Sequence, residues 1–206
     1  LHGDSERALT HGEASLAANR SLADIKGQAY AHGTLAEVYF QRRDTCSTQS
    51  HLLRSIELFE RMGMTANTAD RYLLLGKLYA QTKEFARAER ALRHCLQLLE
   101  NSPSQQLIAA AKMALSLVHI ERQNYAEALR EREAVLAIYE SANEPQLIAY
   151  SLAALGEIHV LQQELDAAES YYRRALSAFE KLGDEVGQAV VYDNMGDAAT
   201  QRDQKA

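Results

Sequence analysis

A period of 40 residues runs through the chain and limits what it can fold into. Three columns of residues follow it: one of alanine, one of leucine or methionine, and one of small residues. The columns are Ala29, Ala69, Ala109, Ala149 and Ala189; Leu35, Leu75, Leu115, Leu155 and Met195; and Ala36, Gly76, Ser116, Gly156 and Gly196. A fixed period of this length is the signature of a repeat architecture, in which each unit packs mainly on its neighbours. We expect one segment over 1–206, with units at 25–64, 65–104, 105–144 and 145–184 and partial units at about 1–24 and 185–206.

Composition and periodicity favour helices throughout. The chain has two prolines and no tryptophan, and apolar residues recur at helical spacing over 65–81 and again over 85–100. Asn124 with Glu127, and Asp166 with Glu169, resemble capping boxes. The prediction is an all-α fold, a right-handed α-solenoid of antiparallel helix hairpins with about ten helices. First helices are expected at about 25–42, 65–81, 105–122, 145–162 and 185–201, and second helices at about 4–20, 44–62, 84–100, 124–140 and 164–181.

The motif within each unit resembles the tetratricopeptide repeat, in its long type of about 40 residues that occurs in bacterial regulators and LGN-like adaptors. The best copies are Tyr72-Leu75-Gly76-Tyr79 with Ala88, Leu152-Leu155-Gly156-His159 with Ala168, and Tyr192-Met195-Gly196. The resemblance implies a TPR-like superhelix that serves as a non-catalytic scaffold for protein or peptide partners. It further implies a cytoplasmic segment of a larger bacterial regulatory or signalling protein.

The same resemblance implies that first helices line a concave face. The residues expected on that face are Tyr30, Glu37, Asp70, Leu73, Lys77, Met113, Leu117, Tyr150, Glu157, Asp193 and Asp197. They form a floor that is acidic at both ends and apolar at Leu73, Met113 and Leu117, which suits a peptide with basic and apolar anchors. Two alternatives stay open: an effector-sensing domain that binds a small signalling peptide or metabolite, and a face that is merely solvated.

The last predicted helix contains apolar residues without an expected neighbour. Val190, Val191, Tyr192 and Met195 would face a following helix, and repeat proteins usually cover such an edge. We expect either further chain in the intact protein or a second copy that covers Tyr192 and Met195 in a homodimer.

Charge and motifs exclude several classes of function. The net charge is −6, and residues 105–206 carry nine Lys and Arg against sixteen Asp and Glu, which argues against nucleic acid as a partner. The sequence contains no run of 18 apolar residues, so no membrane span is predicted. No catalytic or phosphate-binding motif is present, so we expect no enzyme activity and no cofactor. His119 and His159 share one register but lie a whole repeat apart, which favours packed histidines over a metal site. Cys46 and Cys95 are expected to be free thiols.

Overall fold

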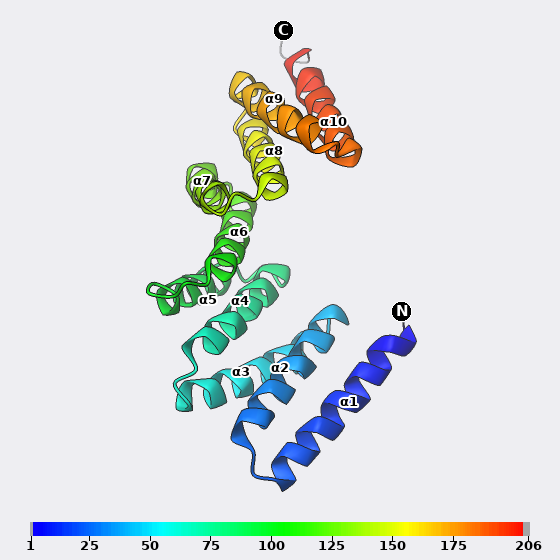
Figure 1. Ribbon diagram of the computed structural model, residues 1–206, viewed down its shortest axis with the longest axis vertical. Helices are drawn as coiled ribbons and strands as arrows, with labels where there is room; N and C mark the ends of the chain where they lie inside the picture. The colour runs from blue at the N-terminus through cyan, green and yellow to red at the C-terminus, as the bar shows by residue number, and fades with distance from the viewer. Residues whose placement is uncertain (1, 204–206) are drawn as a thin grey trace. The chain divides into compact units, whose positions relative to one another are not determined.

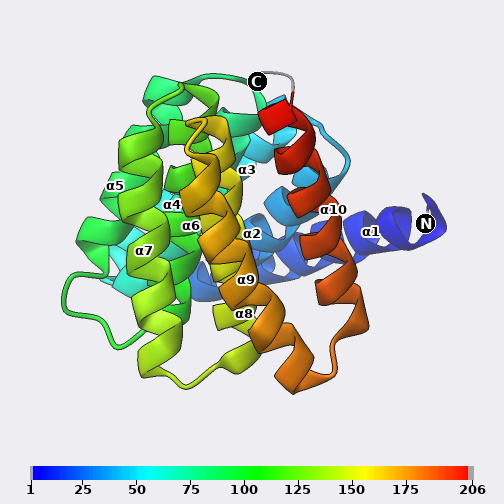
Figure 2. The same cartoon turned by 90° about the horizontal axis from the view of Figure 1, so that it is seen from above.

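The computed structural model describes residues 2–203, which form ten α-helices and no strand (Figures 1 and 2). The predicted all-α fold is therefore confirmed. The chain divides into two compact units between Ala114 and Leu115, and the boundary falls within α6. The helices are α1 (His2–Ser21), α2 (Ile25–Gln41), α3 (Thr45–Arg61), α4 (Thr65–Gln81), α5 (Phe85–Leu98), α6 (Gln105–Glu121), α7 (Tyr125–Ser141), α8 (Pro145–Leu161), α9 (Leu165–Leu182) and α10 (Glu185–Asp203).

In the first unit each helix packs on the next, from α1 to α5 (Figure 1). The column of small residues explains the close approach of α4 and α5. A Cβ added at Gly76 would lie 2.5 Å from Leu92 Cγ, so no larger residue fits without a shift of α5. Leu92 is fully buried, as is Leu52 at the equivalent place on α3. Tight packing at small residues is thus what holds each hairpin together.

The second unit repeats this arrangement with different side chains. Helix α8 packs on α7 and α9, and α9 packs on α10. Gly156 faces Tyr172, whose Cε1 would lie 2.5 Å from an added Cβ. Ser116 donates a hydrogen bond of 3.1 Å from its hydroxyl to the Ala128 carbonyl. At Gly196, by contrast, an added Cβ would meet nothing within 4 Å, so the last member of the column has no packing partner there.

The turns between helices share one backbone device. A residue with positive φ follows the helix end in eight turns: Ala23, Arg43, Gly63, Lys83, Gln123, Asn143, Gln163 and Gly183. In the α2–α3 turn the Arg43 N–H donates to the Phe40 carbonyl and the Asp44 N–H to the Tyr39 carbonyl, each at 3.0 Å. This is the Schellman pattern, which satisfies the last carbonyls of a helix and reverses the chain.

Aspartates, rather than the predicted boxes, cap three of the helix starts. Asp24, Asp44 and Asp184 accept hydrogen bonds of 2.9, 3.0 and 2.9 Å from the backbone N–H three residues later. Asn124 precedes α7 but its side chain makes no capping bond. Asp166 lies within the first turn of α9 and not before it. Both predicted capping boxes are therefore wrong: α9 begins before Asp166, and the Asn124 side chain does not cap α7.

The length and hydropathy of the helices bear on whether any of them could cross a membrane. Over residues 2–203, none of them combines the length and apolar character that a bilayer crossing requires.

Candidate binding surfaces

In the first unit the predicted face carries an aromatic residue held from two sides. Tyr30 on α2 is 43% exposed, and its ring packs edge-on against Phe59 at 5.1 Å between centroids. Its hydroxyl accepts a hydrogen bond of 3.1 Å from Asn67 Nδ2 on α4. Lys77, also on α4, is exposed. Tyr30 is thus a fixed aromatic surface with limited freedom to reorient.

A cation that the sequence reasoning missed neutralises the acidic part of this face. Arg71 on α4 donates to Glu37 on α2 and to Asp70, each at 2.6 Å. Its side chain is 13% exposed, and Gly33 makes room for it, since an added Cβ there would lie 2.8 Å from Arg71 Nη1. Glu37 and Asp70 are therefore ion-paired carboxylates rather than free ones, and the three groups together carry a single negative charge.

The apolar floor expected between the acidic ends needs revision. Leu73 is 6% exposed, so its side chain belongs to the interior and offers almost no surface. Met113 is half-buried, and only Leu117 is well exposed, at 53%. Leu73, Leu75 and Leu78 are all buried, so the apolar side chains of α4 are covered on more than one side of the helix.

In the second unit the predicted carboxylates remain on the surface. Glu157 on α8 and Asp193 and Asp197 on α10 are exposed. Asn194 on α10 donates a hydrogen bond of 3.1 Å to Glu157 Oε1, which fixes α10 against α8 at this point. Burial, together with the charges of Glu157 and Asp197, raises the pKa of the Tyr172 hydroxyl. Glu157 and Asp197 are therefore both within electrostatic reach of Tyr172.

An aromatic pair repeats the first unit's geometry beside these carboxylates. Tyr150 on α8 is 44% exposed and packs edge-on against Phe179 at 4.9 Å between centroids. Its hydroxyl donates to Asp184 Oδ2 at 3.4 Å. Tyr150 is thus an exposed ring with a fixed orientation, seven residues and two helical turns before Glu157.

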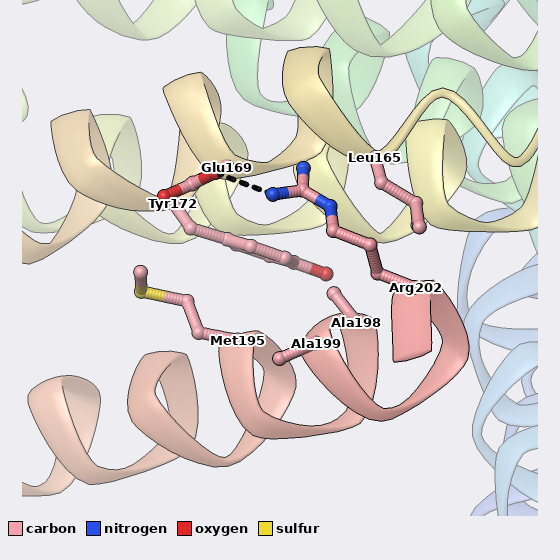
Figure 3. Close-up of a pocket in the computed structure, with 7 residues that line it drawn as sticks. All are labelled: Leu165, Glu169, Tyr172, Met195, Ala198, Ala199 and Arg202. Atoms are coloured by element: carbon pink, nitrogen blue, oxygen red, sulfur yellow. Dashed lines mark ion pairs between the residues drawn. The ribbon is translucent and has the colours of Figure 1, made fainter. Parts of the chain in front are cut away.

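A small pocket lies between α9 and α10, at the predicted self-association edge (Figure 3). Its volume is about 140 Å³, and Met195 and Tyr172 form part of its wall. Arg202 on α10 crosses it to pair with Asp166 at 2.6 Å and with Glu169 at 3.6 Å on α9.

The exposed residues of α10 are fewer than the sequence suggested. Tyr192 is 55% exposed and Val190 is 46% exposed, whereas Met195 is half-buried against the core of the unit. Val191 is fully buried, so its expected exposure is wrong. Val191 belongs to the core cluster that residues of α8 and α9 form. Tyr192 and Val190 are therefore the exposed apolar groups among these four residues.

The histidines and cysteines are separate groups. His159 bonds to Glu164 Oε2 at 2.8 Å and stacks on Tyr171. His119 is 3% exposed, which confirms the predicted packed histidine, although its Nδ1 has no hydrogen-bond partner. Cys46 is exposed, and burial raises the pKa of the Cys95 thiol to about 12. Within residues 2–203 no three His, Cys, Asp or Glu side chains are grouped to hold a metal ion.

Family models decide the class of the chain. Two models described as tetratricopeptide repeat match residues 107–181 and residues 69–101. This protein belongs to the tetratricopeptide repeat family. The matched residues include the Leu75-Gly76 and Leu155-Gly156 steps at which Leu92 and Tyr172 pack. A comparison of this tetratricopeptide repeat protein with curated proteins finds no match in sequence.

Solved structures with the same helical repeat fold include three informative cases. BtubC from P. vanneervenii gives a TM-score of 0.73 at 15% identity, with 97% of this chain and 92% of that chain covered. Aspartyl phosphate phosphatase F from Bacillus subtilis gives 0.81 at 14%, with 98% and 55% covered. A Rap protein complexed with competence and sporulation factor gives 0.71 at 14%, with 98% and 60% covered. This tetratricopeptide repeat protein thus spans little more than half the length of the last two, and the likeness concerns the fold.

Proposed function

We propose that this protein is a non-catalytic scaffold that binds a protein or peptide segment on the first-helix face of its second unit. The observation that carries the proposal is the acidic surface of Glu157, Asp193 and Asp197 beside the exposed ring of Tyr150. An aromatic ring of fixed orientation on the same helix face as an exposed carboxylate suits a segment that presents a Lys or Arg beside an apolar anchor.

The first unit contributes less to this proposed site. Arg71 already occupies Glu37 and Asp70, and Leu73 is buried. A basic ligand would have to displace an arginine held at 2.6 Å on both sides before it gained those carboxylates. The proposed binding surface is therefore centred on α8 and α10 rather than spread evenly along the chain.

A solved relative in fold supports a peptide as the class of ligand. The Rap protein with 98% of this chain covered was solved in complex with competence and sporulation factor. We place this protein in the same general role, as the interaction segment of a larger bacterial regulatory protein in the cytoplasm. An effector-sensing role remains the alternative, in which the bound molecule is a signalling peptide or metabolite.

The experiment is a binding measurement with charge variants of the proposed surface. A panel of fluorescent peptides that combine Lys or Arg with Leu or Phe is titrated by anisotropy. The triple variant Glu157→Gln, Asp193→Asn and Asp197→Asn should weaken the best peptide by about tenfold or more and reduce its salt dependence.

A matched control separates the surface from net charge. The variant Glu127→Gln, Glu133→Gln and Glu140→Gln removes three exposed carboxylates from α7 instead. It should change affinity by less than about twofold, because distant charges are screened. Equal weakening by the two triple variants would mean that only net charge attracts the peptide and would overturn the proposed site.

A further inference from the structure

A polar hollow lies among α1, α2 and α3, away from the surface proposed for peptides. Its volume is about 600 Å³, and each of the three helices contributes to its wall. The charged side chains in the wall are Glu13 and Arg20 on α1 and Arg54 on α3. Leu16 and Leu35 add an apolar side. Small-molecule sites have this size and this mixture of an apolar wall with a few polar groups.

Two histidines meet in the hollow. His32 on α2 is 7% exposed, and its Nδ1 lies 3.0 Å from Nδ1 of His51 on α3. One of these nitrogens must accept the hydrogen, so at least one imidazole is neutral. Burial, then His51, Arg20 and Arg54, lowers the pKa of His32 to about 4. The pKa of His51 is also lowered, chiefly by burial, while Glu13 opposes that shift.

The charges around the pair leave a cationic hollow. Glu13 is the one carboxylate in its wall, against the two guanidinium groups of Arg20 and Arg54. Glu57 pairs with Arg54 at 2.5 Å along the same helix, but Arg54 remains 46% exposed and retains further N–H donors. Guanidinium groups on two sides repel a cation and suppress imidazole protonation, so a metal is disfavoured and an anion is favoured.

The equivalent place one repeat later shows that repeat packing does not require these residues. Among α3, α4 and α5, Glu60 stands in the register of Arg20, Tyr72 in that of His32, and His94 in that of Arg54. There the Tyr72 hydroxyl donates to Glu60 Oε1 at 3.2 Å, and its ring meets His94 edge-on at 4.4 Å. Tyr72 and His94 also border a hollow there, but it is smaller, at about 330 Å³, and its cations are Arg87 and Arg90 of α5. In the first hollow the two imidazoles bond to each other, and the two arginines come from different helices.

We propose that the hollow among α1, α2 and α3 is a binding site for a small organic oxyanion, a phosphate monoester carried on an apolar body. Arg20 and Arg54 would donate to the phosphate oxygens from opposite sides, as guanidinium groups do in phosphate sites. His32 and His51 would donate as they become protonated, and Leu16 and Leu35 would contact the apolar body. The site uses none of the residues of the proposed peptide surface, so either proposal can fail without the other.

The first test measures binding of simple probes to the full chain. Sulfate, phenyl phosphate and phenol are titrated at constant ionic strength, with the His32 and His51 ring signals followed by NMR. Sulfate and phenyl phosphate should both shift the two signals saturably, and phenyl phosphate should bind about tenfold tighter, because only it also contacts the apolar wall. Phenol should bind more weakly than either. Absence of any saturable shift with phenyl phosphate would overturn the site.

Arginine variants locate the site and remove the effect of general charge. Arg20→Gln and Arg54→Gln should each weaken phenyl phosphate by about tenfold. Arg93→Gln is the matched control, since Arg93 also pairs with a glutamate on its own helix but lies on α5. It should have an effect below about twofold. Equal weakening by Arg54→Gln and Arg93→Gln, with helicity unchanged by circular dichroism, would show diffuse attraction and refute the proposal.

The pH dependence of sulfate binding reports on the imidazoles. Sulfate stays a dianion across this range, so its affinity should rise by about tenfold between roughly pH 7.5 and 5.5 as binding draws a proton onto the histidine pair. His32→Gln with His51→Gln should flatten the dependence. A flat profile in the unaltered protein would show that the histidines take no part and would overturn the site as described.

Discussion

The hollow among α1, α2 and α3 and its equivalent among α3, α4 and α5 differ in their side chains although they occupy the same positions of the repeat. In the second, Tyr72 contacts both Glu60 and His94, and the hollow beside it is smaller, at about 330 Å³. In the first, Arg20, Arg54 and the two histidines surround an open volume. The difference shows that the residues of the repeated columns determine where helices pack, whereas the residues between the columns determine what the hollow beside them can bind.

The largest expected effect comes from giving the first hollow the chemistry of the second. The triple variant Arg20→Glu, His32→Tyr and Arg54→His should reduce phenyl phosphate affinity by more than about a hundredfold, or about 2.7 kcal/mol. Both guanidinium groups are lost, and a carboxylate is added. Calorimetric titration measures the change, with thermal unfolding as the check that the hairpins remain. If the triple variant still binds phenyl phosphate with unchanged affinity, the side chains that distinguish the two regions do not determine binding.

The two regions should also differ in their response to acid. The folded-state pKa of His32 lies near 4, below its unfolded value of 6.5, so the unfolded chain takes up the proton first and stability falls as pH decreases between these values. The free energy of unfolding should drop by about 2 kcal/mol between roughly pH 7 and 5.

Urea unfolding at the two pH values measures this loss. His32→Gln should remove most of it, because the substituted side chain does not titrate. Tyr72→Phe, at the equivalent place on α4, should leave the pH dependence unchanged. A loss that persists in His32→Gln would assign the acid sensitivity to another group.

A smaller effect is expected where the second region is packed most tightly. Gly76→Ala should destabilise by about 1–2 kcal/mol, because the added Cβ meets Leu92 at 2.5 Å. Gly196→Ala is the same change in the same register with nothing within 4 Å. It should stabilise by about 0.5–1 kcal/mol through helix propensity. Chemical denaturation of both variants tests the pair, and effects of the same sign would contradict the packing described.

The smallest effect should be the same in the two regions. Arg43 and Lys83 end α2 and α4 with φ values of 59° and 60°. Glycine adopts this conformation without steric strain, so Arg43→Gly and Lys83→Gly should each stabilise by about 0.5–1 kcal/mol. Differential scanning calorimetry compares them. Clearly unequal gains would mean that the two regions differ in their turns as well as in their side chains.

The helices were predictable from sequence, and the reason is visible at particular residues. Leu92 and Tyr172 pack on Gly76 and Gly156. The residues that reveal the repeat in the sequence are therefore the ones that make the contacts between helices. Predicted helix limits deviate by only a few residues, the clearest case being α5, which ends at Leu98. Capping was harder to read, because an Asn or Asp near a helix start does not reveal which backbone N–H its side chain reaches.

The candidate sites were less predictable, because they depend on pairs from different helices. Arg71 and Glu37 are 34 residues apart, and nothing in either helix alone marks them as partners. His32 and His51 lie in different registers of different helices, so neither the repeat nor either helix alone marks them as neighbours. Leu73 was misassigned because one residue along a helix turns a side chain by about 100°, enough to move it from the surface to the core.

The ion triplet of Glu37, Arg71 and Asp70 has a mechanical consequence. Arg71 ties α4 to α2, two successive first helices, through a guanidinium held at 2.6 Å on both sides. Any movement that separates α2 from α4 or slides one along the other must break the Arg71–Glu37 contact. The ion pair therefore resists such movement between neighbouring repeats. Because the two carboxylates are about half exposed, dissolved ions weaken the tie. Higher ionic strength should therefore loosen the contact between α2 and α4.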